Sequence, residues 1–216
     1  MFLYSILHAV SKWLLHAKIF TITKKYIMKK YLILCYSKSG NSKYIAKKLS
    51  KELLCDIETI HPLFNNIGFL FLATLLKIPI PTNITSKKIN EYNEIILIGP
   101  IWGGQLIAPL QTVIKKCISL SKPIHFAVTC ETTENDKDKE YGFEQVLKKA
   151  IIIGGNLIKT TDAFSTSLVK NYDSNIKKGV TVKTHITDEN YSDELEKRLL
   201  NFKNGILYSN TPIEHC

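Results

Sequence analysis

The chain has 216 residues, of which 45% are hydrophobic and 22% charged, and its formal net charge is +10. This length and apolar content are typical of one globular domain with an ample core. The lysines are spread along the chain without a dense run or a nucleic-acid motif, so they indicate a solvated basic surface and argue against a nucleic-acid partner. The five scattered cysteines form no C-x-x-C pair, which argues against a thioredoxin-type site, an iron–sulfur run and a zinc ribbon, and suits reduced thiols.

Residues 1–27 read as an N-terminal extension, because segment 2–18 separates apolar and polar faces at helical spacing. His8, Lys12 and His16 interrupt this segment, so it predicts a helix on a membrane surface and not one that crosses a bilayer. A second interpretation stays open: translation starts at Met28, just before the first predicted strand, and residues 1–27 are not part of the protein. We divide the chain into 1–27, a single domain at 28–208, and a C-terminal tail at 209–216.

The first strand of the domain is predicted by the short apolar run Tyr31–Tyr36, which ends in a loop of hydroxyls, one glycine and one asparagine at 37–42. An amphipathic helix then begins, because Ile45, Leu49 and Leu53 recur every fourth residue. Backbone N–H groups and the positive end of a helix dipole make such a strand–loop–helix junction an anion site. We expect a phosphate here, and the alternative is a serine-rich cap on an ordinary helix.

Beyond this helix, short strands alternate with helices. The apolar segment 68–76 is too short to cross a bilayer, and we expect a buried helix or a cover over a pocket. Residues 100–105 are expected to form a loop, Gly154-Gly155 to end a helix, and Ser192 to cap a last helix that stops at Gly205. The further strands are predicted at 56–60, 93–99, 123–130 and 156–163.

This alternation predicts a parallel sheet that is covered by helices on both faces. Ligands of such sheets bind at the carboxyl ends of the strands. Three loops with unusual composition, at 37–42, 100–105 and 129–135, each follow a predicted strand. We therefore expect these three loops to converge on one site, although they lie far apart in the sequence.

The loop Ser37-Lys38-Ser39-Gly40-Asn41-Ser42 resembles the phosphate loop of flavodoxins, commonly (Ser/Thr)-x-Thr-Gly-(Asn/Ser)-(Thr/Ser), with serine in each threonine place. Together with the turn Gly-Pro-Ile-Trp-Gly-Gly at 99–104 and the helix start Tyr-Gly-Phe at 141–143, it makes residues 29–164 similar to a flavodoxin-type protein. The resemblance implies an α/β fold: a flavodoxin-like doubly wound five-stranded parallel sheet of order 2-1-3-4-5 with helices on both faces. It also implies FMN as a non-covalent cofactor.

Carried over residue by residue, the resemblance implies three groups of cofactor-binding residues and neither a catalytic residue nor a metal ligand. Trp102 is the candidate for stacking on the flavin ring, and its alternative role is a partly buried core aromatic. Glu131 and Glu134 are candidates to place negative charge near the ring, and Tyr141 to reach the flavin or to start a helix. The phosphate residues are Ser37, Lys38, Ser39, Gly40, Asn41 and Ser42; the ring residues are Pro100, Ile101, Trp102 and Gly103; the second flavin loop is Thr129, Cys130, Glu131 and Thr132.

The function implied is that of an FMN-binding redox protein that transfers electrons through its flavin. Its partner is a redox protein or a small acceptor such as a quinone. The alternatives are an NAD(P)H-dependent quinone or flavin reductase of the same fold, and a flavin-free binding module. The expected location is cytoplasmic, with peripheral membrane contact through residues 2–18 as a further hypothesis.

Overall fold

The computed structural model describes residues 31–172 and 184–209. The predicted amphipathic segment 2–18, the alternative start at Met28 and the tail beyond 209 lie outside the described residues. The three domain boundaries therefore stay predictions. Among the helices that are described, none is long and apolar enough to cross a membrane.

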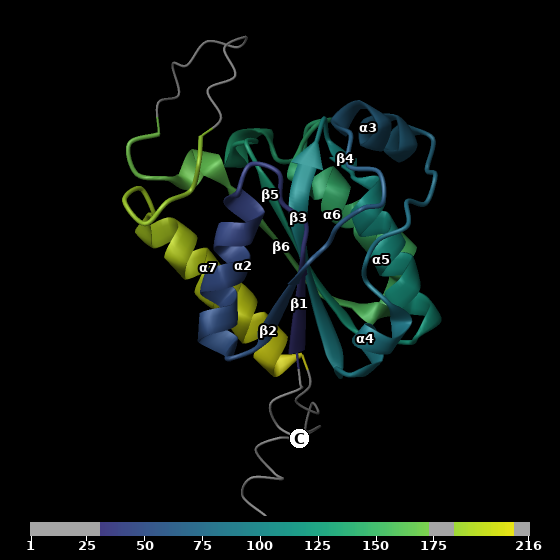
Figure 1. Ribbon diagram of the computed structural model, residues 1–216. Helices are drawn as coiled ribbons and strands as arrows, with labels where there is room; N and C mark the ends of the chain where they lie inside the picture. Colours follow the sequence, from purple (N-terminus) through teal and green to yellow (C-terminus); the bar gives the residue numbers. More distant parts are fainter. Residues whose placement is uncertain (1–30, 173–183, 210–216) are drawn as a thin grey trace, which may run out of the picture.

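The centre of the molecule is a parallel sheet whose main strands run in the order β2-β1-β3-β5-β6 (Figure 1). Each neighbouring pair along this path is parallel. In chain order these strands give 2-1-3-4-5, which is the flavodoxin-like doubly wound order and confirms the predicted fold class. The main strands are β1 (Tyr31–Cys35), β2 (Asp56–Thr59), β3 (Glu94–Trp102), β5 (Ile124–Cys130) and β6 (Ile158–Ser165).

Helices cover both faces of the sheet, with α2 (Asn41–Leu53) and α7 (Asp193–Tyr208) on one face, and α5 (Ala108–Ser119) and α6 (Phe143–Gly154) on the other (Figure 1). Side chains alternate along a strand. Leu32 and Leu34 therefore join the core on the α5 and α6 side, whereas Ile33 and Cys35 join the core on the α2 and α7 side. Every residue of β1 is buried, as a central parallel strand requires.

The crossover between β2 and β3 carries two helices, α3 (Ile67–Leu75) and the short α4 (Ser86–Asn90). The prediction of a buried helix at 68–76 is wrong, because Phe69, Leu72 and Leu76 are 43%, 53% and 60% exposed. The helix α3 packs on α5 and β4, beyond the end of the main sheet, so only part of its surface finds a partner (Figure 1).

The predicted loop at 100–105 is also wrong, because β3 continues to Trp102 and then turns back. Gly103 and Gly104, with φ of +52° and +67°, form a two-residue turn into the short strand β4 (Gln105–Leu106). This antiparallel pairing adds a sixth strand to the predicted five. Two successive positive φ angles are the geometry of a tight hairpin turn, and glycine adopts them without strain.

The helix α6 ends at Gly154, as predicted, but two other boundaries differ from prediction. A 3₁₀ turn, η2 (Gly155–Leu157), follows α6, so β6 starts at Ile158, two residues later than expected. The last helix passes through Gly205 to Tyr208, because this glycine serves close packing. A Cβ at position 205 would lie 3.2 Å from Cγ2 of Thr160 on β6. The two other 3₁₀ turns are η1 (Glu134–Asp136) and η3 (Thr166–Leu168).

Candidate functional site

The candidate site is a cavity of about 710 Å³ where β1, β3 and β5 end. This volume suits a small-molecule ligand. Its walls come from the three segments that follow β1, β3 and β5, from the helix α3, and from Tyr141, which was a candidate to reach the ligand. The lining residues are Lys38, Ser39, Asn41, Ile67, Phe71, Pro100, Ile101, Trp102, Gly103, Gly104, Thr129, Cys130, Glu131, Thr132 and Tyr141.

The loop after β1 has the geometry of an anion site. Gly40 has φ of +97°, and its N–H donates to Ser37 Oγ at 3.1 Å, which folds the loop back on itself. The backbone N–H groups of Ser39, Asn41 and Ser42 have no acceptor among the described residues. The first turn of α2 holds no acidic residue. Open N–H groups at a helix N-terminus attract a negatively charged group.

Three of the predicted phosphate residues shape this loop and do not line the cavity: Ser37, Gly40 and Ser42. The hydroxyl of Ser42 is buried and lies 2.7 Å from Thr129 Oγ1, so it joins the first loop to the loop after β5. If Thr129 is the donor of this bond, the Ser42 hydroxyl keeps its own hydrogen for an anion, beside the backbone N–H of the same residue. Lys38 lines the cavity, and its Nζ donates to the carbonyl of Asn65 at 3.3 Å.

The side chain of Asn41 connects the first loop to a segment more than a hundred residues away. Its Oδ1 accepts from Ile186 N–H at 2.9 Å, and its Nδ2 donates to the Thr184 carbonyl at 3.1 Å. Both polar atoms of the amide are thereby used. Asn41 holds the segment after residue 183 against the start of α2, beside the cavity.

The second wall is the β3–β4 hairpin with Trp102 at its end. The indole packs edge-on against Tyr36, with ring centroids 5.9 Å apart, and also lines the cavity. Trp102 thus packs against the core and also lines the cavity, and its role in stacking on a ligand stays a prediction. The turn is confined on both sides, because a Cβ on Gly103 would meet Phe71 of α3 at 3.5 Å and one on Gly104 would meet the Tyr141 Cα at 2.7 Å.

The third wall is the loop after β5, from Thr129 to Thr132. Burial raises the pKa of the Cys130 thiol to about 12, so the thiol stays protonated at neutral pH. A protonated, buried thiol is a poor nucleophile, and Cys130 acts here as a small neutral wall residue. Glu131 brings the only acidic side chain among the lining residues.

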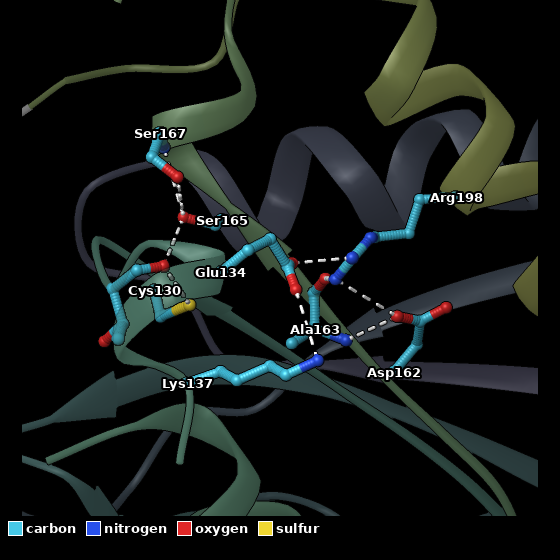
Figure 2. A network of polar contacts seen from close by, with 9 residues as sticks. Cys130, Glu134, Lys137, Asp162, Ala163, Ser165, Ser167 and Arg198 are labelled. Atoms are coloured by element: carbon cyan, nitrogen blue, oxygen red, sulfur yellow. Dashed lines mark hydrogen bonds and ion pairs between the residues drawn. The ribbon is translucent and has the colours of Figure 1, made fainter. Parts of the chain in front are cut away.

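Arg198 of α7, the only arginine of the chain, braces this loop from behind (Figure 2). Its guanidinium donates to Glu134 Oε1 and to the Ala163 carbonyl, each at 2.6 Å. Ser165 Oγ donates to the Thr132 carbonyl at 2.6 Å (Figure 2). Glu134, expected near the flavin ring, is thus a partner of Arg198 and does not line the cavity.

The residues that sequence reasoning did not assign to the site are Ile67 and Phe71 of α3, Gly104 of the hairpin and the brace Arg198. The signal for α3 was its apolar run, which favoured a cover over a pocket as one alternative, and two of its side chains do line the cavity. The signal for Arg198 was its rarity, in a chain where the other basic residues are lysines.

The same network makes stability depend on pH through Asp162. Burial raises the pKa of this carboxyl from 3.8 to about 6, against the opposing effects of the Ala163 N–H and Arg198. The folded chain therefore holds a proton more tightly than the unfolded chain, and this contribution to stability is lost as pH rises from about 4 to about 6. We expect Asp162→Asn, which keeps the acceptor for Ala163, to remove this loss.

The measurement is urea unfolding of both proteins between pH 4 and pH 8. The stability of the variant relative to the wild type should rise by roughly 2 to 3 kcal/mol across this range, because each pKa unit corresponds to about 1.4 kcal/mol. Only the difference between the two proteins is compared, since other carboxyls titrate in both. A difference that is constant with pH would contradict the prediction.

No protein-family model and no curated protein matches the chain. Among solved structures, the chain is similar to a flavoprotein from Lactobacillus acidophilus NCFM in complex with FMN, with 17% identity, 63% of this chain and 91% of that chain covered, and a TM-score of 0.46. For oxidised flavodoxin 2 from Bacillus cereus the identity is 13%, the match covers 82% of this chain and 97% of that chain, and the TM-score is 0.47. For Fusobacterium nucleatum flavodoxin bound to flavin mononucleotide the identity is 14%, the match covers 83% of this chain and 98% of that chain, and the TM-score is 0.42. Since these TM-scores lie below 0.5, the fold assignment rests on the strand order and pairing of the sheet itself.

Proposed function

We propose that this chain binds FMN non-covalently in the cavity and transfers electrons through it. The observation that carries the proposal is the convergence of three loops, after β1, β3 and β5, on one cavity beside a helix N-terminus with open N–H groups. The three segments differ in chemistry. The first offers open N–H groups, the second is a hairpin with an aromatic side chain, and the third has uncharged side chains and one carboxylate. A ligand with a phosphate at one end and a planar ring at the other matches this order.

The residues present fit FMN without a cationic phosphate ligand. The N–H groups of Ser39, Asn41 and Ser42 would hold the phosphate, and the positive φ of Gly40 lets the backbone approach it closely. Trp102 would cover one side of the ring, since indoles stack well on planar groups. Pro100, Ile101 and Cys130 would surround the ring with uncharged walls that exclude water.

When bound, FMN supplies the electron-carrying chemistry, and the protein tunes its potential through charge, hydrogen bonds and burial. The Glu131 carboxylate at the cavity would disfavour extra negative charge on the ligand. The loop holds this carboxylate in place, because Ser165 and Arg198 fix the chain just after it, at Thr132 and at Glu134.

A reductase acting on a small planar acceptor such as a quinone is the second candidate. It is favoured by Ile67, Phe71 and Tyr141, whose largely apolar side chains extend the cavity wall beyond the three loops. Steady-state oxidation of NAD(P)H with menadione separates the two. Turnover without a partner protein supports the reductase, whereas its absence supports a shuttle between proteins.

The first experiment is the visible absorption spectrum of the purified protein, followed by titration with FMN and with riboflavin. We expect FMN to bind at least about a hundredfold more tightly than riboflavin, since only FMN offers a phosphate to the charge-assisted N–H bonds of the loop. A protein that takes up neither flavin would contradict the proposal. Equal affinities for FMN and riboflavin would show that residues 37–42 do not bind the phosphate.

Replacing Trp102 with alanine tests the ring site. We expect the dissociation constant for FMN to rise roughly tenfold, because an aromatic stacking partner contributes about 1 kcal/mol or more. Tyr208→Ala on α7 is the matched control, since this aromatic side chain is exposed and is not among the residues that line the cavity. Equal FMN affinity in the two variants would show that the indole is only a core residue.

A further inference from the structure

The chain exposes a continuous apolar segment around α3, which we term the α3 patch. Apolar side chains scattered singly on a surface need no explanation, but a contiguous group marks an interaction site. The helix itself, Ile67–Leu75, carries no charged residue and lies at the rim of the molecule, beyond the main sheet (Figure 1). The patch consists of Leu63, Phe64, Ile67, Phe69, Phe71, Leu72, Leu75, Leu76 and Ile78, each at least 39% exposed.

The segment that carries the patch has few acidic residues, and one carboxylate, Glu131, lines the first cavity together with Ile67 and Phe71. From residue 59 to residue 130 the only acidic residues are Glu91 and Glu94. Glu94 is buried against His125, and Glu91 follows α4 at the opposite end of the molecule from α3 (Figure 1). The patch therefore carries no negative charge of its own.

Lysines border the patch on the side of α5 and α6. A second cavity of about 320 Å³ lies between α3, α5 and α6, and its lining includes Lys77, Lys115 and Lys149 together with the apolar Leu75 and Ile152. None of these lysines forms an ion pair with an acidic residue in the described parts of the chain. Apolar surface with a lysine border is complementary to an anionic lipid surface.

We propose that the α3 patch docks on an anionic membrane, with the lysine border on the lipid headgroups. Lysine is depleted at protein–protein interfaces, which favour arginine, whereas its long stem reaches readily from apolar surface to headgroups. The single arginine lies on α7, on the other face of the sheet. Since Ile67 and Phe71 also line the first cavity, docking would bring that cavity to the membrane surface. The proposal goes beyond the redox function and does not depend on flavin binding.

The test is co-sedimentation of the full chain with phosphatidylcholine vesicles that contain or lack phosphatidylglycerol, combined with hydrogen exchange of the backbone amides. We expect binding to the anionic vesicles, with weakening as salt is added. Amide protection should appear over residues 63–78 and be absent from α7. The exchange pattern separates this surface from the predicted amphipathic segment 2–18, which is retained in the experiment.

Two sets of variants test the two components of the surface. Leu72→Ser with Leu76→Ser, neither of which lines the first cavity, should weaken vesicle binding at least about tenfold through lost apolar burial. Lys77→Gln and Lys115→Gln should each weaken it roughly fivefold. The matched control is Leu200→Ser with Leu207→Ser, which removes two exposed leucines from α7. Urea unfolding of the serine variants reports whether the fold is intact, independently of flavin binding.

Three outcomes would overturn the proposal. Vesicle binding without protection at 63–78 would place attachment elsewhere. Failure to bind vesicles, together with a dimer that the Leu72 and Leu76 changes dissociate, would make the patch an interface between two copies of this chain. A monomer that binds neither kind of vesicle would leave the patch to a protein partner.

Discussion

Replacement of Gly142 by alanine is expected to lower the free energy of unfolding by about 3 kcal/mol and to weaken FMN binding at least tenfold. Gly142 is the N-cap of α6, and an added Cβ would lie 1.9 Å from the Lys137 carbonyl oxygen and 2.6 Å from that of Asp136. Both contacts are with backbone, so no side-chain rotation relieves them. The loop after β5 has to move, and it carries Glu131 and Tyr141 to the cavity.

Urea unfolding and FMN titration measure the two effects. Gly68→Ala in α3 is the matched control, because its new Cβ meets only the Asn66 side chain, at 3.3 Å. We expect it to change stability by no more than about 1 kcal/mol, because the better helix propensity of alanine opposes the cost of shifting the Asn66 side chain that caps α3. If Gly142→Ala is as stable as the control and binds FMN normally, the loop is not confined as described.

The second large effect is expected from Glu94→Ala, which should cost about 3 kcal/mol of stability and leave FMN affinity unchanged. The imidazole of His125 is fully buried, with Nε2 at 2.8 Å from Glu94 Oε2 and Nδ1 at 2.8 Å from Thr160 Oγ1. Removing the carboxylate leaves a buried ring nitrogen without its partner, which is costly whether the pair is neutral or charged. Glu94 starts β3, at the end of the strand away from the cavity, so the site should be undisturbed.

Glu52→Ala is the control for this prediction, because Glu52 forms an ion pair with Lys203 at a similar distance, 2.9 Å, but is largely exposed. Exposed pairs contribute about 1 kcal/mol or less. Urea unfolding of the two variants compares a buried and a surface partner directly. A similar cost for both would show that water replaces the Glu94 carboxylate.

The features of the site that could be predicted are those set by residues close together in the sequence. The loop 37–42 is defined by neighbours in the chain: an apolar strand before it, a glycine that accepts positive φ and an amphipathic helix after it. Its prediction as an anion cradle agrees with the open N–H groups in the structure. The convergence of the segments that follow β1, β3 and β5 was predictable from strand alternation, since parallel strands share one carboxyl edge, although the segment at 100–105 is a hairpin and not the predicted loop.

Other features depend on contacts between distant segments. Ser42 was expected to offer its hydroxyl to a phosphate, but that hydroxyl bonds Thr129, 87 positions further on. Glu134 was expected near the flavin ring, but it pairs with Arg198, 64 positions further on. Neither partner can be predicted from periodicity or loop composition, because the packing of strands and helices brings these distant residues into contact.

The sequence by itself determined the five main strands, the doubly wound class and the strand ends at which the cavity forms, because these depend on hydrophobic period, turn residues and the handedness of crossovers. Only the tertiary structure decided which apolar segment stays exposed. The run at 68–76 reads as buried from composition, yet it lies beyond the sheet with partners on only part of its surface. Burial is a property of what packs against a segment, and the segment's own residues do not specify that neighbour.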